Sequence, residues 1–339
     1  MTARGGIAIL GNGRVARAVF YYLKKNKSAG KIALLTNDNG KIKDCNLIIG
    51  ALAGGLGEDC LRLALQYKKS LIDVSDLDPE FYLKRKTRIE KSGITVIAGC
   101  GFSPGLVNLI LGKELSRYPD LREIEVKAGS LSPNKFFFPF LWCFEDLILE
   151  HQIPSWQIIK GKKKKFPPFA GYQKEKFFHV EAESYLCASG FENLLEKTQL
   201  KNFQCRVVRP GGFRTFFNFL RNQGFLKKDN LMLSKNILES KKQDNFTLSE
   251  IILSTENKRI IWRLRSHSKK NEKLNSMQKI TAAVPALIAK LLLDNKIKQP
   301  GLVFMEDLGR DELIFDSVLS GLRKEGIAIS KNQFMANSL

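Results

Sequence analysis

The first 35 residues of this chain strongly limit the folds that it can adopt. An apolar run at residues 7–10 is followed directly by a turn at residues 11–16 that reads G-N-G-R-V-A. Apolar residues then recur at helical spacing from residue 15 to residue 23, and a second apolar run covers residues 32–35. This order predicts a strand, a tight turn, an amphipathic helix and a parallel second strand, the opening unit of a dinucleotide-binding fold.

Each small residue of such a turn has a physical task. The first glycine permits the tight turn, the second lets the backbone approach a pyrophosphate, and the alanine keeps the helix close to the strand. The helix N-terminus adds free amides and a partial positive charge. A plain strand-to-helix turn is the alternative for such a motif taken alone. The residues predicted to contact the cofactor here are Gly11, Asn12, Gly13, Arg14, Val15 and Ala16.

The pattern continues along the chain. Apolar runs at residues 47–51, 70–74 and 94–98 alternate with helical patterns, including a charged helix at residues 79–91. Such alternation predicts a parallel sheet covered by helices on both faces. Beyond residue 120, strand-like runs follow at 124–127, 157–159, 177–182, 205–208 and 260–265, and they predict a second domain built on a mixed sheet. An apolar helix is expected over 280–293, with a kink or a helix start at Pro285.

Composition limits the class of protein. A chain of 339 residues favours two domains, and 44% hydrophobic with 26% charged residues is typical of folded proteins. The six cysteines form no C-x-x-C pair and only three histidines accompany them, so we expect reduced thiols, a cytoplasmic location and no metal site. No apolar stretch reaches the roughly 20 residues of a membrane span, so the chain is expected to be soluble.

The formal net charge of +21 favours association with phosphates, nucleic acid or anionic membrane surfaces. The lysines are nevertheless spread along the chain, and the densest run, at residues 162–165, reads as a solvated turn. The aromatic and basic motifs that read bases are missing, so no specific nucleic-acid partner is predicted. A basic nucleic-acid or membrane-surface protein remains an alternative, which would require a steep salt dependence of binding.

The choice of cofactor depends on the tip of the second strand. Thr36 and Asn37 lie there, with Asp38 one step later, and an acidic side chain at this point would bind the ribose hydroxyls of NAD. Lys41 and Lys43 are close enough in sequence to neutralise the extra phosphate of NADP. Asp38 equally suits a simple turn before a glycine. Either NAD or NADP therefore fits.

Four segments carry a family resemblance, in matching order. They read S-L-I-D-V-S (70–75), C-G-F-S-P-G (100–105), L-W-C-F-E-D (141–146) and V-V-R-P-G-G-F (207–213), and the apolar helix near residue 280 follows them. In these segments the chain resembles the saccharopine dehydrogenases and the related carboxynorspermidine dehydrogenases. The resemblance implies reversible hydride transfer at a carbon–nitrogen bond of an amino-acid or polyamine-precursor substrate, with NAD or NADP, in a homodimer.

The resemblance also implies roles for particular residues. Asp73 and Cys100 would be catalytic, Asp73 by handling protons, and Arg209 would bind a substrate carboxylate through its rigid guanidinium fork. Ser103 is placed to cap a helix with Pro104 at its first position, and its amides would face the substrate. Structural roles are the alternatives for Asp73, Cys100 and Arg209. The cofactor set adds Thr36, Asn37, Ala51 and Ser75, and the substrate set is Ser103, Pro104, Gly105 and Arg209.

The implied architecture is an α/β Rossmann-type doubly wound parallel sheet with an inserted mixed α+β substrate domain. Residues 1–118 would form the dinucleotide-binding domain, 119–275 the substrate-binding and dimerisation domain, and 276–339 a helical segment that returns to the first. The chain departs from the family in having Ser103 for aspartate and Cys143-Phe144 for Ser-Pro. It also has only a short segment between the second strand and Leu47. A catalytically silent NAD(P)-binding sensor or assembly protein is the competing hypothesis.

Overall fold

The computed structural model describes residues 5–26, 30–36, 40–75, 77–135, 137–187 and 190–335. The chain divides into two compact units, and neither is continuous in sequence. The first unit comprises Met1–Pro119, Ser189–Lys197 and Gln278–Gly326, and the second comprises Asp120–Ala188, Thr198–Met277 and Ile327–Leu339. The segment 276–339 therefore contributes to both units.

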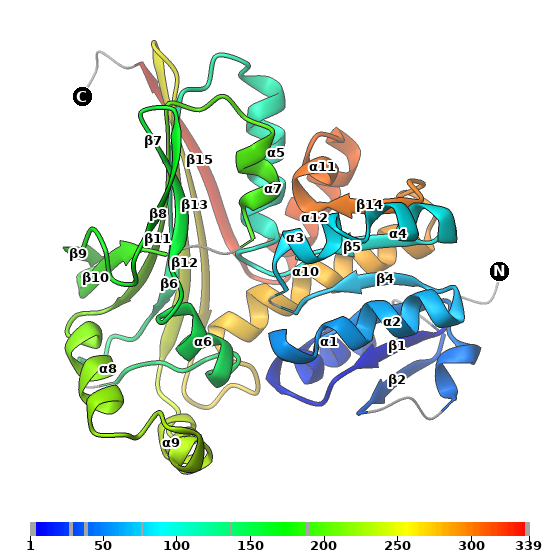
Figure 1. The fold of residues 1–339 in the computed structure, drawn as a ribbon, viewed down its shortest axis with the longest axis horizontal. Helices are drawn as coiled ribbons and strands as arrows, with labels where there is room; N and C mark the ends of the chain where they lie inside the picture. The colour runs from blue at the N-terminus through cyan, green and yellow to red at the C-terminus, as the bar shows by residue number, and fades with distance from the viewer. Residues whose placement is uncertain are drawn as a thin grey trace. The chain divides into compact units, whose positions relative to one another are not determined.

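The first unit is built on a parallel six-stranded sheet with the order β14-β5-β4-β3-β1-β2 (Figure 1). The sheet order reverses at β1, which lies between β2 and β3, and ligands of open α/β sheets bind at the carboxyl ends of strands beside such a reversal. The predicted parallel sheet is thus confirmed. The strands are β1 (Ile7–Leu10), β2 (Ile32–Leu35), β3 (Leu47–Gly50), β4 (Ser70–Asp73), β5 (Thr95–Ala98) and β14 (Gly301–Phe304).

Helices connect these strands. The charged segment expected as one helix forms two, because the chain leaves the helix at Lys84 and Arg85. Between β2 and β3 the described residues contain only a 3-10 turn, Lys41–Asp44, in agreement with the short spacing in the sequence. The helices of this unit are α1 (Arg14–Lys25), α2 (Glu58–Tyr67), α3 (Pro79–Leu83), α4 (Lys86–Ser92), α5 (Leu106–Arg117), α7 (Glu192–Glu196), α11 (Met305–Gly309) and α12 (Glu312–Lys324).

Helix α10 (Ser276–Leu293) is the long apolar helix of the chain. It begins at Ser276 and continues through Pro285, so the expectation of a helix start at the proline is wrong. Its length and composition satisfy those of a membrane span, but 56% of it is buried inside the protein. Ile280, Val284 and Ile288 are fully buried, which is the pattern of a helix in a protein core.

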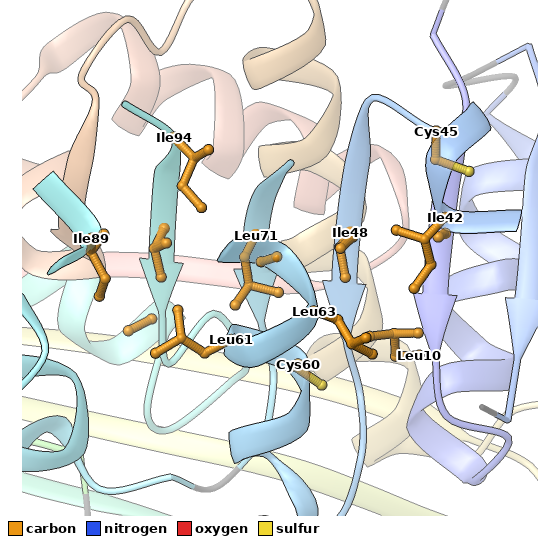
Figure 2. Packing of buried hydrophobic residues seen from close by; sticks show 14 of the residues in the cluster. Leu10, Ile42, Cys45, Ile48, Cys60, Leu61, Leu63, Leu71, Ile89 and Ile94 are labelled. Atoms are coloured by element: carbon orange, nitrogen blue, oxygen red, sulfur yellow. The ribbon is translucent and has the colours of Figure 1, made fainter. Parts of the chain in front are cut away.

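One face of the parallel sheet packs against α2 and α4. Figure 2 shows Leu10, Ile48 and Leu71 from successive strands in contact with the apolar face of α2, which contributes Cys60 and Leu61. All five side chains are at most 3% exposed. This burial stabilises the sheet, at roughly 25 cal/mol for each Å² of apolar surface removed from water, and so fixes the strand ends where the site lies.

The second unit is a mixed nine-stranded sheet with the order β15-β13-β12-β6-β11-β10-β9, to which the hairpin of β7 and β8 is added at β11. Strands β11 and β6 are parallel and the other pairs are antiparallel. The expected mixed sheet is therefore confirmed. Its strands are β6 (Glu123–Leu131), β7 (Ser155–Ile159), β8 (Lys162–Phe166), β9 (Gln173–Phe177), β10 (Val180–Leu186), β11 (Asn202–Pro210), β12 (Asn245–Ser254), β13 (Lys258–Ser268) and β15 (Ala328–Met335).

Two local expectations in this unit are wrong. The lysine run is strand β8, whose exposed lysines suit an edge strand because charge discourages pairing with other chains. Residues 177–182 belong to two strands, because Phe178 and His179 adopt positive φ and turn the chain between β9 and β10. Helices α6 (Phe144–Glu150), α8 (Phe213–Asn222) and α9 (Lys228–Ser240) complete the unit.

Candidate functional site

The glycine turn joins β1 to α1 at the carboxyl edge of the parallel sheet. Gly11 has φ +125°, and a Cβ built there would lie 2.4 Å from the carbonyl oxygen of Ala51, so this position requires glycine. Gly13 differs, because its φ of −74° is open to any residue and an added Cβ would meet no described atom within 4 Å. The fold itself thus requires only the first glycine, and the absence of a side chain at Gly13 leaves open space at the mouth of α1.

The N-terminus of α1 suits an anion. Among the described residues no side chain caps the helix at Gly13, and its first turn contains no acidic residue. The first amides of a helix have no partner within the helix and carry partial positive charge. Arg17 donates from Nε to the backbone oxygen of Asn12 at 2.9 Å and to its Oδ1 at 3.0 Å, which holds the turn in place. These features fit the pyrophosphate of a dinucleotide.

The neighbouring strand ends supply the rest of the predicted cofactor set. Ala51 donates its backbone N–H to Leu10 at 2.9 Å, and Gly11 donates to Leu35 at 2.8 Å, so the ends of β1, β2 and β3 are linked at the turn. Thr36 is exposed directly after β2. Asn37 lies outside the described residues, as do Asp38 and Asn39. The structure therefore brings the turn and Ala51 together beside the tip of β2.

Asp73 ends β4 and is fully buried. Its Oδ2 accepts hydrogen bonds from the Ser75 hydroxyl at 2.5 Å and from the Tyr82 hydroxyl, and its Oδ1 accepts from the Ser75 amide at 3.3 Å. Burial raises the pKa of this carboxyl from 3.8 to about 6, although the hydrogen bonds from Ser75 and Tyr82 act in the opposite direction. Both carboxylate oxygens are thus occupied by protein donors, an arrangement that favours a structural or positioning role for Asp73.

Because the pKa of Asp73 is raised in the folded state, the free energy of unfolding should depend on pH. The unfolded chain releases the proton near pH 3.8 and the folded chain near pH 6, so the stabilising contribution of Asp73 is full below pH 3.8 and is lost as the pH rises through 6. We expect the wild type to lose about 1 to 2 kcal/mol relative to Asp73→Asn between pH 5 and pH 7.5. Urea denaturation across that range measures the difference. Parallel pH profiles of the two proteins would contradict the raised pKa.

Cys100 follows β5 and belongs to the same buried cluster. Its side chain is fully buried, and its backbone N–H donates to the carbonyl oxygen of Asp73 at 2.7 Å. Burial and the neighbouring Asp73 carboxylate raise the pKa of the thiol well above 9, which opposes formation of a nucleophilic thiolate. The structure therefore brings Asp73, Ser75 and Cys100 together, but it leaves neither Asp73 nor Cys100 exposed.

The turn before α5 differs from the expectation. Helix α5 begins at Leu106 with Gly105 as its N-cap, so Ser103 does not cap it and Pro104 is not its first residue. Gly105 has φ +130° and lies against Gly101, and its N–H is bound by the side chain of Asn108 at 3.0 Å. Because that tight return of the chain precedes the helix, Ser103 and Pro104 lie in a partly exposed turn at the carboxyl end of β5.

Arg209 lies on β11 in the second unit and is 3% exposed. Its Nη2 donates to Oε2 of Glu150, and its guanidinium lies 5.1 Å from the centre of the Trp142 ring. The buried Nε has no hydrogen-bond partner among the described residues. A substrate carboxylate would thus have to displace Glu150 or use the donor that Glu150 leaves free.

Two important partners were missed at the sequence level. Tyr82 lies nine residues beyond Asp73 on α3, and Glu150 ends α6, far in sequence from the arginine that it binds. His151, left unassigned, is buried and bonds the Tyr185 hydroxyl at 2.7 Å, and burial lowers its pKa from 6.5 to about 4. Periodicity shows that such residues lie on helices, but only tertiary packing shows what they contact. Within the described ranges, no group of metal-ligating side chains is placed to hold an ion.

Comparison with known proteins decides the family. The family model described as the saccharopine dehydrogenase C-terminal domain matches residues 101–327 of the 339-residue chain. The chain belongs to the saccharopine dehydrogenase family. The family resemblance is thereby confirmed, and the matched residues contain the segments at 141–146 and 207–213 but not the one at 70–75.

One solved structure shows the fold. The apo saccharopine dehydrogenase (L-Glu forming) of Saccharomyces cerevisiae matches with a TM-score of 0.74 at 16% identity, and the match covers 97% of this chain and 100% of that one. An engineered D-amino acid dehydrogenase bound to NADP+ has a TM-score of 0.45 at 11% identity, covering 94% and 99% of the two chains. The first match shows that this chain has the saccharopine dehydrogenase fold.

Proposed function

We propose that this protein is an NAD(P)-dependent oxidoreductase that acts at a carbon–nitrogen bond of an amino-acid or polyamine-precursor substrate. The observation that carries the proposal is the open space at Gly13, before an uncapped helix and at the reversal point of a parallel sheet. A glycine that the fold itself does not require is accounted for by a ligand that needs the room. Family membership supports the reaction type.

The residues of the chain would divide the work of binding and orientation. The amides at Gly13 and the following turn of α1 would hold the pyrophosphate, with Gly11 fixing the turn against Ala51. A bound nicotinamide would supply or accept the hydride. Asp73 would act as a positioning residue, holding Ser75 and Tyr82 in place at the end of β4. Arg209, on β11 of the second unit, would orient a substrate carboxylate.

A binding titration and a turnover assay, made on the same protein, test the proposal. NADH and NADPH fluorescence, titrated with the full chain, reports cofactor binding, and absorbance of the reduced nicotinamide reports turnover. We expect turnover with pairs of an amino compound and a keto acid or aldehyde, because these condense to an imine. Binding of the nucleotide without turnover on lysine, glutamate, polyamine precursors or their carbonyl partners would remove the proposed reaction while leaving the cofactor site intact.

One set of observations favours the alternative of a catalytically silent NAD(P)-binding protein. Asp73 and Cys100 have no exposed surface, and Glu150 already occupies the guanidinium of Arg209. In a silent protein these groups would serve stability alone. The assay distinguishes the two functions, since an enzyme should turn over carboxylate substrates, whereas a silent protein should bind the nucleotide without turnover.

A further inference from the structure

The exposed apolar residues of α8, α9 and the turn between them form a patch that the dinucleotide site does not explain. Both helices belong to the second unit and lie below its sheet in the view of Figure 1. Single exposed apolar residues are ordinary on protein surfaces, but a group of large ones marks an interaction site. The α8–α9 patch consists of Phe219 (54% exposed), Phe225 (42%), Met232 (65%), Leu233 (61%) and Ile237 (56%).

The opposite face of α9 is held against the protein, so the exposure is a property of the fold. Leu231 and Leu238 pack on the aromatic cluster around Phe213 and Phe217. The Ser234 hydroxyl donates to the carbonyl oxygen of Phe225 at 2.7 Å. These contacts fix the rotation of the helix and leave Met232, Leu233 and Ile237 exposed on its outer side, beside the exposed polar residues Asp229 and Asn236.

The charges beside the patch are mostly positive. From residue 214 to residue 242 the chain contains seven lysines and arginines but two acidic residues. Lys235 is paired with Glu145 at 2.8 Å. The basic residues of the segment that are exposed and flank the patch are Arg221, Lys227, Lys228, Lys241 and Lys242.

We propose that the α8–α9 patch docks on an anionic membrane surface. The five apolar side chains would enter the boundary between headgroups and acyl chains, and the flanking basic residues would contact anionic headgroups. A symmetric contact between two copies is disfavoured, because it would bring two basic segments together without opposite charges to balance them. The net charge of +21 adds long-range attraction to the same surface. This inference is independent of the dinucleotide site.

Vesicle co-sedimentation of the full chain tests the apolar part of the proposal. We expect binding to phosphatidylcholine vesicles that contain phosphatidylserine, weakening with added salt, and little binding to phosphatidylcholine alone. Met232→Ser combined with Leu233→Ser should weaken binding about tenfold or more, with an unchanged melting temperature because both side chains are exposed. The matched control is Leu56→Ser combined with Leu313→Ser, at residues of the first unit that are 58% and 80% exposed, which should bind as the wild type does.

A second pair of variants tests the charges. Lys227→Gln combined with Lys228→Gln should weaken binding about tenfold, whereas Lys162→Gln combined with Lys164→Gln on β8 removes equal charge far along the sequence and should have a much smaller effect. Equal effects of the two pairs would reduce the interaction to net charge and overturn the proposal. Sedimentation velocity tests the alternative that a second copy of the chain covers the patch. If the protein is a dimer, and the double variant Met232→Ser, Leu233→Ser is a monomer, the patch is a dimer contact instead.

Discussion

Gly13→Val is expected to abolish the binding of NADH and NADPH while the chain remains folded. The valine side chain would occupy the space at the mouth of α1 that the pyrophosphate needs, and we expect a loss of affinity of more than about a hundredfold. The backbone at Gly13 is already extended, and an added Cβ meets no described atom within 4 Å, so stability should hardly change. Fluorescence titration and a thermal melt of the same sample measure both quantities.

Two matched variants make this result specific. Gly13→Ala should give an intermediate loss of affinity, because its side chain is smaller. Gly11→Ala should instead lower the melting temperature, because its Cβ would lie 2.4 Å from the Ala51 carbonyl oxygen at a φ of +125°. Wild-type affinity in Gly13→Val would exclude this turn as the phosphate site, and a lowered melting temperature would mean that Gly13 is a structural glycine.

Glu150→Ala is expected to destabilise the second unit more than Arg209→Met does. Removing Glu150 leaves the guanidinium charge of Arg209 buried at 3% exposure with no acidic partner, at a cost of about 3 kcal/mol. Removing Arg209 leaves the carboxylate of Glu150, whose side chain is 28% exposed and can be hydrated, and methionine keeps apolar contact with Trp142. We expect this loss to be about 1 kcal/mol.

Chemical denaturation of the two single variants and the double variant measures this asymmetry. The double variant should be about as stable as Arg209→Met alone, because no buried charge is left without a partner. If both single variants lost the same free energy of unfolding, and the double variant lost the sum, the two side chains would contribute independently. That result would contradict a strong interaction between Arg209 and Glu150.

The fold was predictable where the relevant signal is local. The strand, the turn and the helix at residues 7–25 follow from hydrophobic spacing and two glycines, and the short segment before Leu47 agrees with the single 3-10 turn that the described residues contain there. Strand β15 was missed because its alternation is weak and it is largely exposed. The break at Lys84 and Arg85 was also missed, since no glycine or proline marks it.

The candidate site was predictable only in part, for a related reason. Sequence order places Asp73, Ser75 and Cys100 after neighbouring parallel strands, and parallel strands end at one edge. Burial and hydrogen bonding depend on distant segments. The hydroxyl of Tyr82 reaches Asp73 from α3, and Glu150 reaches Arg209 from α6, and neither pairing leaves a trace in spacing. Two of the predicted reactive groups therefore proved to be buried partners of other side chains.

A structure of the protein with NADPH or NADH bound would locate the pyrophosphate. We expect its oxygens to lie within hydrogen-bond distance of the backbone amides at Gly13 and the first turn of α1, with no movement of the Gly11 turn against Ala51. A nucleotide bound elsewhere, or none at saturating concentration of either cofactor, would contradict this expectation.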